Sequence, residues 1–264
     1  MALKISQLTP IAAGTLDGTE PVELGIAGDK SAPNGAFLPP GYIDGLRMTW
    51  VSGTAITVTS GAAYIPSLGR AVRVNAAVAK AGLVLTASTW YHVYLYLNAG
   101  VPDVELSTTA PAAPYNGTAR TKTGDTSRRY VGSVMTDATG AIYAFKQSGQ
   151  IIEYMASIYA APFLVLSGGT ATTPTDVNCA GLVPLTSQLA QLTVINSDTG
   201  VAVVTGTSDQ GYTLGSNTFS GFINPAASVL GNFSLNGSQV LKYMFRSSAA
   251  GNVGIRISGY VYER

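Results

Sequence analysis

The chain has 264 residues, of which 11% are charged, and its formal net charge at pH 7 is +1. This length is enough for one or two domains with a buried core, and the small net charge provides no overall field that would favour nucleic acid or an anionic membrane. An ordinary soluble domain carries about 25% charged residues. A chain so poor in charge, with a positive mean hydropathy, is either a membrane protein or a subunit that buries much of its surface in an assembly.

The apolar runs of the chain are too short for a membrane-spanning helix, which needs about 20 mostly apolar residues. The runs at 83–87 and 162–166 are far shorter and are flanked by Gly, Ser or Thr. The opening segment MALKISQLTP lacks the apolar core of a secretory signal. Cys179 is the one cysteine, so it cannot form an internal disulfide, and we expect it to be a small buried hydrophobe. We therefore expect burial in an assembly and no membrane insertion.

Residues 1–40 lack regular hydrophobic alternation and end in SAPNGAFLPPG. The Pro-Pro-Gly sequence at 39–41 indicates an extended segment that closes with a turn. A segment this short cannot bury a core of its own, so we expect an extended N-terminal arm that becomes ordered on binding a partner. Its candidate attachment residues are apolar: Ile5, Leu8, Ile11 and Leu16.

Period-two alternation dominates from residue 41 onward and predicts strands. The segment TWYHVYLYLN is predicted to carry the following residues on its two faces: Tyr91, Val93, Leu95 and Leu97 on one, and Trp90, His92, Tyr94 and Tyr96 on the other. VGSVMTDATGAIYAFKQSG is predicted to form two strands around a turn at 137–140, where the Gly can adopt a positive φ.

The segment NGTARTKTGDTSRRYVGS, residues 116–133, collects charge in a chain that otherwise has long uncharged runs. Its cations could bind phosphates, but Asp125 lies among them, and Thr and Gly separate them. Arg128 and Arg129 are adjacent, so on a strand they point to opposite faces and one of them can pair inward with a carboxylate. These residues favour a loop held by ion pairs, or a charged subunit contact, over a nucleic-acid site. The candidates for structural ion pairing are Arg120, Asp125, Arg128 and Arg129.

The C-terminal half is also predicted to be β-structured. LAQLTVINSDTGVAVVTG indicates a hairpin with its turn at 196–200, and we predict a strand within 150–159 because its Ile and Tyr content favours β-structure over helix. NVGIRISGYVYER is predicted to be one long strand with an apolar and a polar-aromatic face. The two sets are Val253, Ile255, Ile257, Gly259 and Val261, against Arg256, Ser258, Tyr260 and Tyr262.

These patterns predict an all-β chain in three parts: an extended N-terminal arm at 1–40, a central β-domain at 41–150 and a C-terminal β-sandwich domain at 151–264. Short strands separated by Gly and Asn turns are typical of sandwiches and barrels, so both domains are expected to be sandwich-like or barrel-like. No internal repeat of 20–50 residues is present, which argues against a solenoid.

Motifs for catalysis or metal binding are missing from the sequence. His92 is the one histidine and lies far from Cys179, so no zinc pattern exists. No Gly-x-Ser-x-Gly elbow or phosphate-binding Gly-rich loop appears. Asp103 and Glu105 alternate along PDVELS and could form the carboxylate pair that a glycosidase needs, although solvated strand carboxylates are common. We expect no enzymatic activity, no catalytic residue, no metal and no cofactor.

Several segments resemble sequences shared by tailed-bacteriophage fibre and appendage proteins. They are YIDGLRMTW and ITVTSGAAYIPSLGRAV in the region from Tyr42, STWYHVYLYL from Ser88, ELSTTAPAAPYNGTARTKTGDTSRRYVGSV from Glu105, and SGGTATTPTDVNCAGLVPLTSQLA from Ser167. The N-terminal KISQLTP and LDGTEPVEL are similar to the short attachment segment that opens many such proteins. The resemblance implies a non-enzymatic virion protein, made in the bacterial host cytoplasm. It also implies a homotrimer docked by its N-terminal arm to another virion protein, either a tail adaptor or the capsid.

The uncharged run at 210–241 contains the candidate receptor-binding residues Tyr212, Asn217 and Phe219. Aromatic faces stack on sugar rings and Asn amides hydrogen-bond to hydroxyl groups, so the loop at 211–219 could present these groups to a host surface polysaccharide. The other reading places the aromatic residues in the core. Two other classes stay open: a capsid head fibre or decoration protein, and a glycan-cleaving tailspike enzyme.

Overall fold

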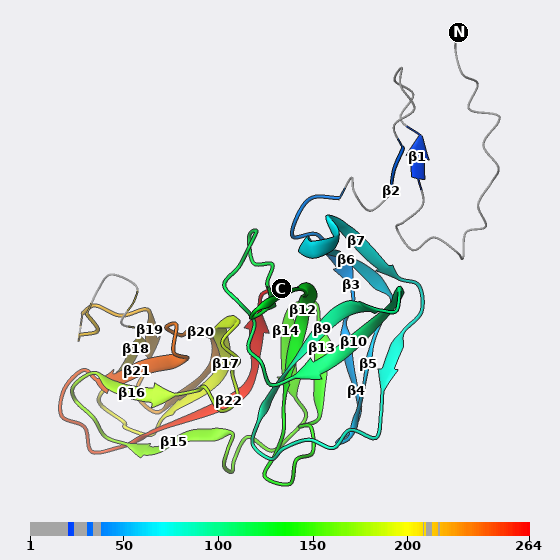
Figure 1. Cartoon of the computed structure of the whole chain (residues 1–264). Coiled ribbons are helices and arrows are strands. Elements are labelled where there is room, and N and C mark those ends of the chain that lie inside the picture. Colours follow the sequence, from blue (N-terminus) through cyan, green and yellow to red (C-terminus); the bar gives the residue numbers. More distant parts are fainter. Residues whose placement is uncertain (1–20, 24–30, 34–37, 208, 210–212, 216) are drawn as a thin grey trace. The chain divides into compact units, whose positions relative to one another are not determined.

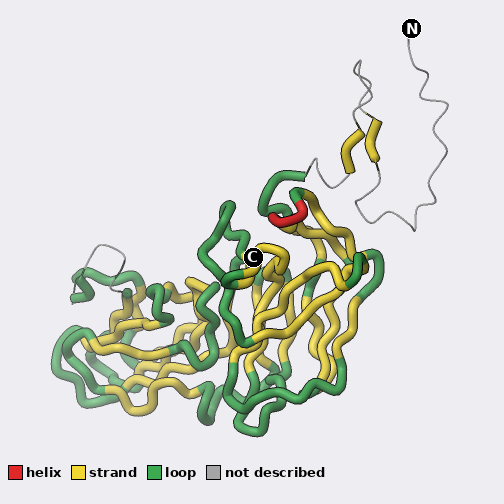
Figure 2. Tube along the Cα trace, in the orientation of Figure 1, coloured by secondary structure: helices red, strands yellow, loops and turns green. Residues whose placement is uncertain are grey.

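A computed structural model describes residues 21–23, 31–33, 38–207, 209, 213–215 and 217–264 (Figure 1). The described residues form several antiparallel sheets, none of them closed, with one short 3₁₀ turn, η3 (Pro66–Leu68), and no α-helix (Figure 2). The expected all-β class is confirmed. No helix in this part of the chain is long and apolar enough to span a membrane. The expected contacts that lie outside the described residues are Ile5, Leu8, Ile11, Leu16 and Tyr212.

The chain divides into two compact units. The first comprises the described residues up to 85, residues 91–134 and Arg264, and the second comprises residues 86–90 and 135–263. The chain passes from the first unit to the second near the end of one strand, between Val134 and Met135, whereas the composition of the sequence changes near residue 150.

The first unit contains four small sheets, each of antiparallel strands. In sheet order they are β1 (Pro21–Glu23) and β2 (Ser31–Pro33); β3 (Ile43–Gly45), β6 (Gly61–Ile65) and β7 (Arg70–Val74); β4 (Met48–Ser52), β5 (Ala55–Val58) and β8 (Val78–Lys80); and β10 (Val101–Ser107), β9 (Trp90–Asn98), β12 (Asp125–Met135) and β11 (Thr121–Lys122).

The described residues of the second unit form two sheets. The first is a six-stranded sheet of β13 (Phe145–Ser148), β14 (Ile151–Tyr154), β22 (Val253–Tyr262), β17 (Ser187–Asn196) and β20 (Ala227–Ser234), with β15 (Leu164–Gly169) also paired to β22. The second is a four-stranded sheet of β16 (Thr175–Asn178), β21 (Val240–Phe245), β18 (Val203–Gly206) and β19 (Gly221–Ile223). The strand predicted within 150–159 is present as β14.

The long C-terminal strand β22 is confirmed as a strand, but the prediction of its two faces is wrong beyond Ile257. The register against β17 shifts between Gln191, which faces Gly259, and Leu192, which faces Ile257. This bulge inserts one extra residue and reverses the faces that follow. Tyr260 is therefore buried on the same side as Ile257, and its ring lies edge-on to Trp90 at 6.1 Å.

For LAQLTVINSDTGVAVVTG, the two predicted strands and the turn at 196–200 are confirmed, but the strands do not pair with each other. Its two strands are present as β17 and β18, but they belong to different sheets, so the turn between them carries the chain from one sheet to the other. The turn at 137–140 is present, with Asp137 Oδ1 accepting hydrogen bonds from the amides of Thr139 at 2.8 Å and Ala141 at 3.0 Å. Beyond it β13 pairs with β14 and not with β12.

A fully buried arginine, Arg129, lies in the first unit. Its Nη1 donates to the carbonyl oxygens of Tyr130 at 2.8 Å and Arg120 at 3.3 Å, and its Nη2 donates to Gly41 O at 3.3 Å. Its Nε has no hydrogen-bond partner among the described residues, and none of their carboxylates forms an ion pair with it. The inward-facing arginine of the Arg-Arg pair thus contacts backbone carbonyls and not a carboxylate. It joins the segment at residue 41 to the strands around residues 120 and 130.

We expect Arg129→Ala to lower the free energy of unfolding by about 3 kcal/mol, because it removes three charge-assisted hydrogen bonds and leaves buried carbonyl oxygens without a donor. Arg128→Ala is the matched control, since it removes the neighbouring arginine from the partly exposed side and should cost less than about 1 kcal/mol. Urea unfolding of both variants measures the difference. Equal losses of stability would contradict this assignment.

Candidate functional site

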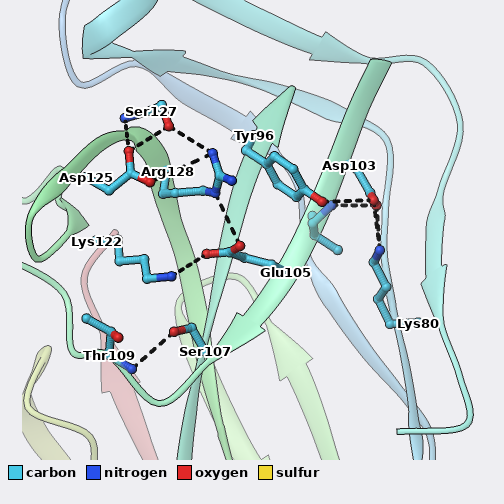
Figure 3. Close-up of polar contacts among 11 residues, drawn as sticks. Lys80, Tyr96, Asp103, Glu105, Ser107, Thr109, Lys122, Asp125, Ser127 and Arg128 are labelled. Atoms are coloured by element: carbon cyan, nitrogen blue, oxygen red, sulfur yellow. Dashed lines mark hydrogen bonds and ion pairs between the residues drawn. The ribbon is translucent and has the colours of Figure 1, made fainter. Parts of the chain in front are cut away.

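The charged segment in the first unit forms a network across the sheet β10-β9-β12-β11 (Figure 3). Arg128 Nε lies 3.2 Å from Glu105 Oε2, and its guanidinium carbon lies 4.0 Å from the centre of the Tyr96 ring. Lys122 Nζ lies 2.9 Å from Glu105 Oε1. Lys80 Nζ, from β8, lies 2.8 Å from Asp103 Oδ1. Each of these cations is neutralised by a neighbouring carboxylate, so the network does not offer a row of free cations to a phosphate backbone.

The four residues expected to form ion pairs have different roles. Asp125 Oδ2 is 3.9 Å from Arg128 Nη1, a longer contact than the one that Arg128 makes with Glu105. Asp125 Oδ1 accepts hydrogen bonds from the Ser127 hydroxyl at 2.6 Å and the Ser127 amide at 2.9 Å, and these bonds lower the pKa of Asp125. Arg120 Nη1 donates to Ala112 O at 3.1 Å. Glu105 was not expected among the ion-pairing residues, although it forms ion pairs with both Arg128 and Lys122.

Asp103 and Glu105 share one face of β10, as the alternation predicts, since their partners on β9 are Tyr96 and Tyr94. Partial burial acts to raise the pKa of Asp103, but hydrogen bonds from Lys80 and the Val104 amide outweigh it, so the pKa lies below its ordinary value. A glycosidase acid needs a raised pKa. Asp103 therefore lacks the raised pKa of such an acid.

His92 is buried on β9, and its Nδ1 lies 2.7 Å from Ser133 Oγ. Burial lowers the pKa of His92 to about 4, so the ring is neutral at pH 7. Over the described ranges, no group of three or more His, Cys, Asp or Glu side chains could hold a metal ion. His92 therefore has the geometry of a packed, hydrogen-bonded core residue.

The second unit carries a hollow that depends on one buried carboxylate, Asp198, in the turn between β17 and β18. Asp198 Oδ1 accepts hydrogen bonds from the amides of Gly200 at 2.8 Å and Val201 at 2.6 Å. Its Oδ2 accepts hydrogen bonds from the amides of Ala250 and Gly251, both at 2.7 Å. A Cβ on Gly251 would lie 2.4 Å from Asp198 Cα, so glycine is required for this approach.

The preceding Asn196 fixes the other side of the same turn. Its Nδ2 donates to Val201 O at 2.9 Å and Asn224 O at 3.1 Å, while its Oδ1 accepts the Asp198 amide at 3.0 Å. Asn196 and Asp198 together therefore hold the segments at 200–202, 224–225 and 250–251 in fixed positions.

The hollow has a volume of about 410 Å³, and the residues that line it are Gly200, Val201, Ala202, Asn217, Pro225, Arg246 and Ser247. Arg246 Nη2 donates to Asn217 Oδ1 at 2.9 Å. The Arg246 guanidinium carbon lies 5.7 Å from the centre of the Phe222 ring, and Phe222 lies 5.4 Å from Phe219. The two Phe side chains are 39% and 38% exposed. We name Asn217, Phe219, Phe222 and Arg246 the Phe–Arg surface.

The Phe–Arg surface contains two of the three expected receptor-binding residues, Asn217 and Phe219; the third, Tyr212, lies outside the described residues. Phe222 was expected in the core under the alternative reading of this run. Its partner across β18 and β19, Val204, is buried with Met244 and Leu214, whereas Phe222 itself is partly exposed. Arg246 was missed. It follows the end of β21, and only the fold brings it to Asn217, so the sequence carried no signal for it.

Asp198→Asn should lower the melting temperature by several degrees at pH 7, because a neutral amide cannot accept four backbone hydrogen bonds. The amides of Gly251, Gly200 and Val201 lower the pKa of Asp198 to about 2, below the value of about 3.9 for an unfolded chain. The stabilisation by Asp198 is therefore complete above about pH 4 and is lost as the pH falls toward 2. Thermal unfolding across this range should show the difference between wild type and variant shrinking with acid.

The control for this prediction is Asp176→Asn, which changes an exposed carboxylate paired with Lys242 in the same unit. It should shift the melting temperature little. If the Asp198 and Asp176 variants behave alike at pH 7, Asp198 does not hold this turn.

Comparisons with known proteins find no match to a family model, a curated protein or a solved structure.

Proposed function

We propose that this chain is a non-enzymatic structural component of a phage virion. In this proposal it is a short trimeric tail fibre that is attached by its N-terminal arm and displays its C-terminal β-domain for binding to a host-surface glycan. The chain needs no cofactor, and its partners are two further copies of itself, another virion protein and the host polysaccharide. It does not bind nucleic acid or insert into a membrane.

Two features of the sequence support the virion part of the proposal. The quoted segments resemble phage fibre and appendage proteins over much of the chain. The low fraction of charged residues fits a subunit that buries its faces against copies of itself.

In the second unit, alternate residues of β17 and β22 are buried, and so are Val203 and Phe245 of the other sheet. This burial favours a sandwich of the two sheets.

The Phe–Arg surface is the observation that carries the glycan-binding part. Two partly exposed aromatic rings lie together beside a hollow whose rim carries an Asn amide, an Arg guanidinium and the residue Ser247. Sugars present apolar ring faces and hydroxyl groups, and this combination of aromatic and amide groups matches both. A trimer repeats the site three times, so weak single-site binding gains avidity.

The ion pairs of the first unit support the absence of catalysis. Asp103 and Glu105 each contact cations, so neither resembles a protonated acid held ready for glycosidic cleavage. The proposed protein therefore binds the glycan and leaves it intact. A head fibre or capsid decoration protein is the alternative that follows if the protein does not bind cells.

Labelled full-length protein should bind susceptible bacteria, and Phe222→Ala or Asn217→Ala should weaken this binding roughly tenfold or more, since each lost contact is repeated in three subunits. Tyr159→Ala is the matched control, because Tyr159 is an aromatic residue that is 72% exposed in the same unit but belongs neither to the Phe–Arg surface nor to the lining of the hollow. Flow cytometry measures the binding, and thermal unfolding checks the fold. Absence of cell binding by the intact protein, with normal adsorption of phage that lack it, would make head decoration the better account.

Deletion of residues 1–30 should leave a soluble folded trimer that no longer joins particles. The reason is that the attachment candidates Ile5, Leu8, Ile11 and Leu16 lie in a segment too short to form its own core. Light scattering measures the mass of the truncated protein, and immunoblots of purified particles measure its incorporation. Normal incorporation would refute attachment through the arm, and a stable monomer at micromolar concentration would refute the trimer.

A further inference from the structure

This inference rests on the proposed glycan-binding function. The charge and the geometry of the hollow then indicate which class of glycan it binds. We propose that the hollow binds an anionic group, a carboxylate or a phosphate, that is carried by a sugar of the host surface. In this assignment Arg246 contacts the anionic group, and the other residues of the Phe–Arg surface, Asn217, Phe219 and Phe222, contact the sugar ring.

Arg246 is held at the rim by contacts on its backbone and its side chain. Its amide donates to Ala202 O at 3.1 Å, which fixes the main chain at the end of β21. Its Nη2 donates to Asn217 Oδ1 at 2.9 Å, and its guanidinium carbon lies 5.7 Å from the centre of the Phe222 ring. A guanidinium oriented in this way presents a planar set of donors, which matches carboxylate and phosphate oxygens better than it matches a neutral hydroxyl.

The residues around Arg246 are compatible with an anion. Among the described residues, the lining apart from Arg246 is uncharged: Gly200, Val201, Ala202, Asn217, Pro225 and Ser247. Asp198, in the turn beside the lining residues Gly200 and Val201, has both of its carboxylate oxygens occupied by backbone amides. The volume of about 410 Å³ falls in the range of small-molecule sites, roughly 300–1,000 Å³.

The aromatic pair favours a sugar that carries the anionic group over a free anion. Phe219 and Phe222 place about two fifths of their surface in solvent beside the guanidinium. A free anion would leave these rings uncovered, whereas a sugar ring that carries the anion would cover apolar surface at the same time. The Asn217 amide nitrogen remains as a donor for a ring hydroxyl.

Calorimetric titration of the full-length protein with four probes tests the assignment. The probes are an oligogalacturonate for a sugar carboxylate, glucose 1-phosphate for a sugar phosphate, maltotriose for a neutral sugar, and inorganic phosphate. One or both anionic sugars should bind at least roughly tenfold more tightly than maltotriose and than inorganic phosphate, and the two arms distinguish the carboxylate from the phosphate.

The variants locate the effect. Arg246→Gln should weaken binding of the anionic sugar by roughly tenfold or more. Arg73→Gln makes the same change of charge at an exposed position of the first unit, and it should leave the affinity unchanged. Asn217→Asp should also weaken binding, because its carboxylate would compete for the guanidinium. Thermal unfolding of each variant confirms that the fold is retained.

Equal affinity for maltotriose, no effect of Arg246→Gln, or no binding of any probe at millimolar concentration would overturn the assignment. Affinity for inorganic phosphate equal to that for the sugars would reduce the hollow to a simple anion site and would also overturn it. If the intact protein binds cells but Arg246→Gln binds them equally well, the anionic class fails while the proposed function survives. If the intact protein binds no cells, the proposed function itself fails.

Discussion

The second unit depends on the carboxylate of Asp198, which accepts four backbone amide hydrogen bonds from two separate segments. The chain has to leave β17 in one sheet and enter β18 in the other, and a crossing of this kind leaves backbone donors without partners in a ladder. Asp198 supplies the missing acceptors, and Asn196 extends the same role to the segment at 224. This turn holds Gly200 and Val201 at the hollow, and the neighbouring Ala202 accepts the amide hydrogen bond of Arg246.

In the first unit, the arginines on the two sides of strand β12 have different partners. Arg129 is buried and satisfies backbone carbonyl oxygens, so its cost of desolvation is offset by hydrogen bonds within the core. Arg128 lies on the other side among Glu105, Asp125 and Tyr96. Two adjacent arginines thus serve separate functions, and the concentration of charge in 116–133 is explained by contacts inside the protein.

Much of the fold is visible in the sequence because strand alternation is a local property. The all-β class, the strands β9, β14 and β22, and the turn at 137–140 follow from period-two patterns and turn residues. Which strand pairs with which does not follow, because pairing depends on contacts between segments far apart in the chain. The turn at 196–200 resembles a hairpin turn locally, yet the amides of Ala250 and Gly251, some fifty residues away, determine its course.

The candidate site was predictable in part for the same reason. Asn217 and Phe219 stand out in an uncharged run rich in Gly and Asn. Arg246 does not, since only the fold brings it to Asn217, 29 positions earlier in the chain. The burial of Tyr260 could not be anticipated either, because a bulge against β17 reverses the faces of β22 and leaves no mark in the alternation.

The charged network of the first unit is paired within the protein, whereas the Phe–Arg surface of the second unit is partly exposed to solvent. A cryo-EM map of intact particles would test this account most directly. The account predicts three copies attached through their N-terminal arms, with Phe222 and Arg246 of each copy open to solvent. A map in which this surface lies against the capsid or the tail, or between copies of the chain, would contradict it.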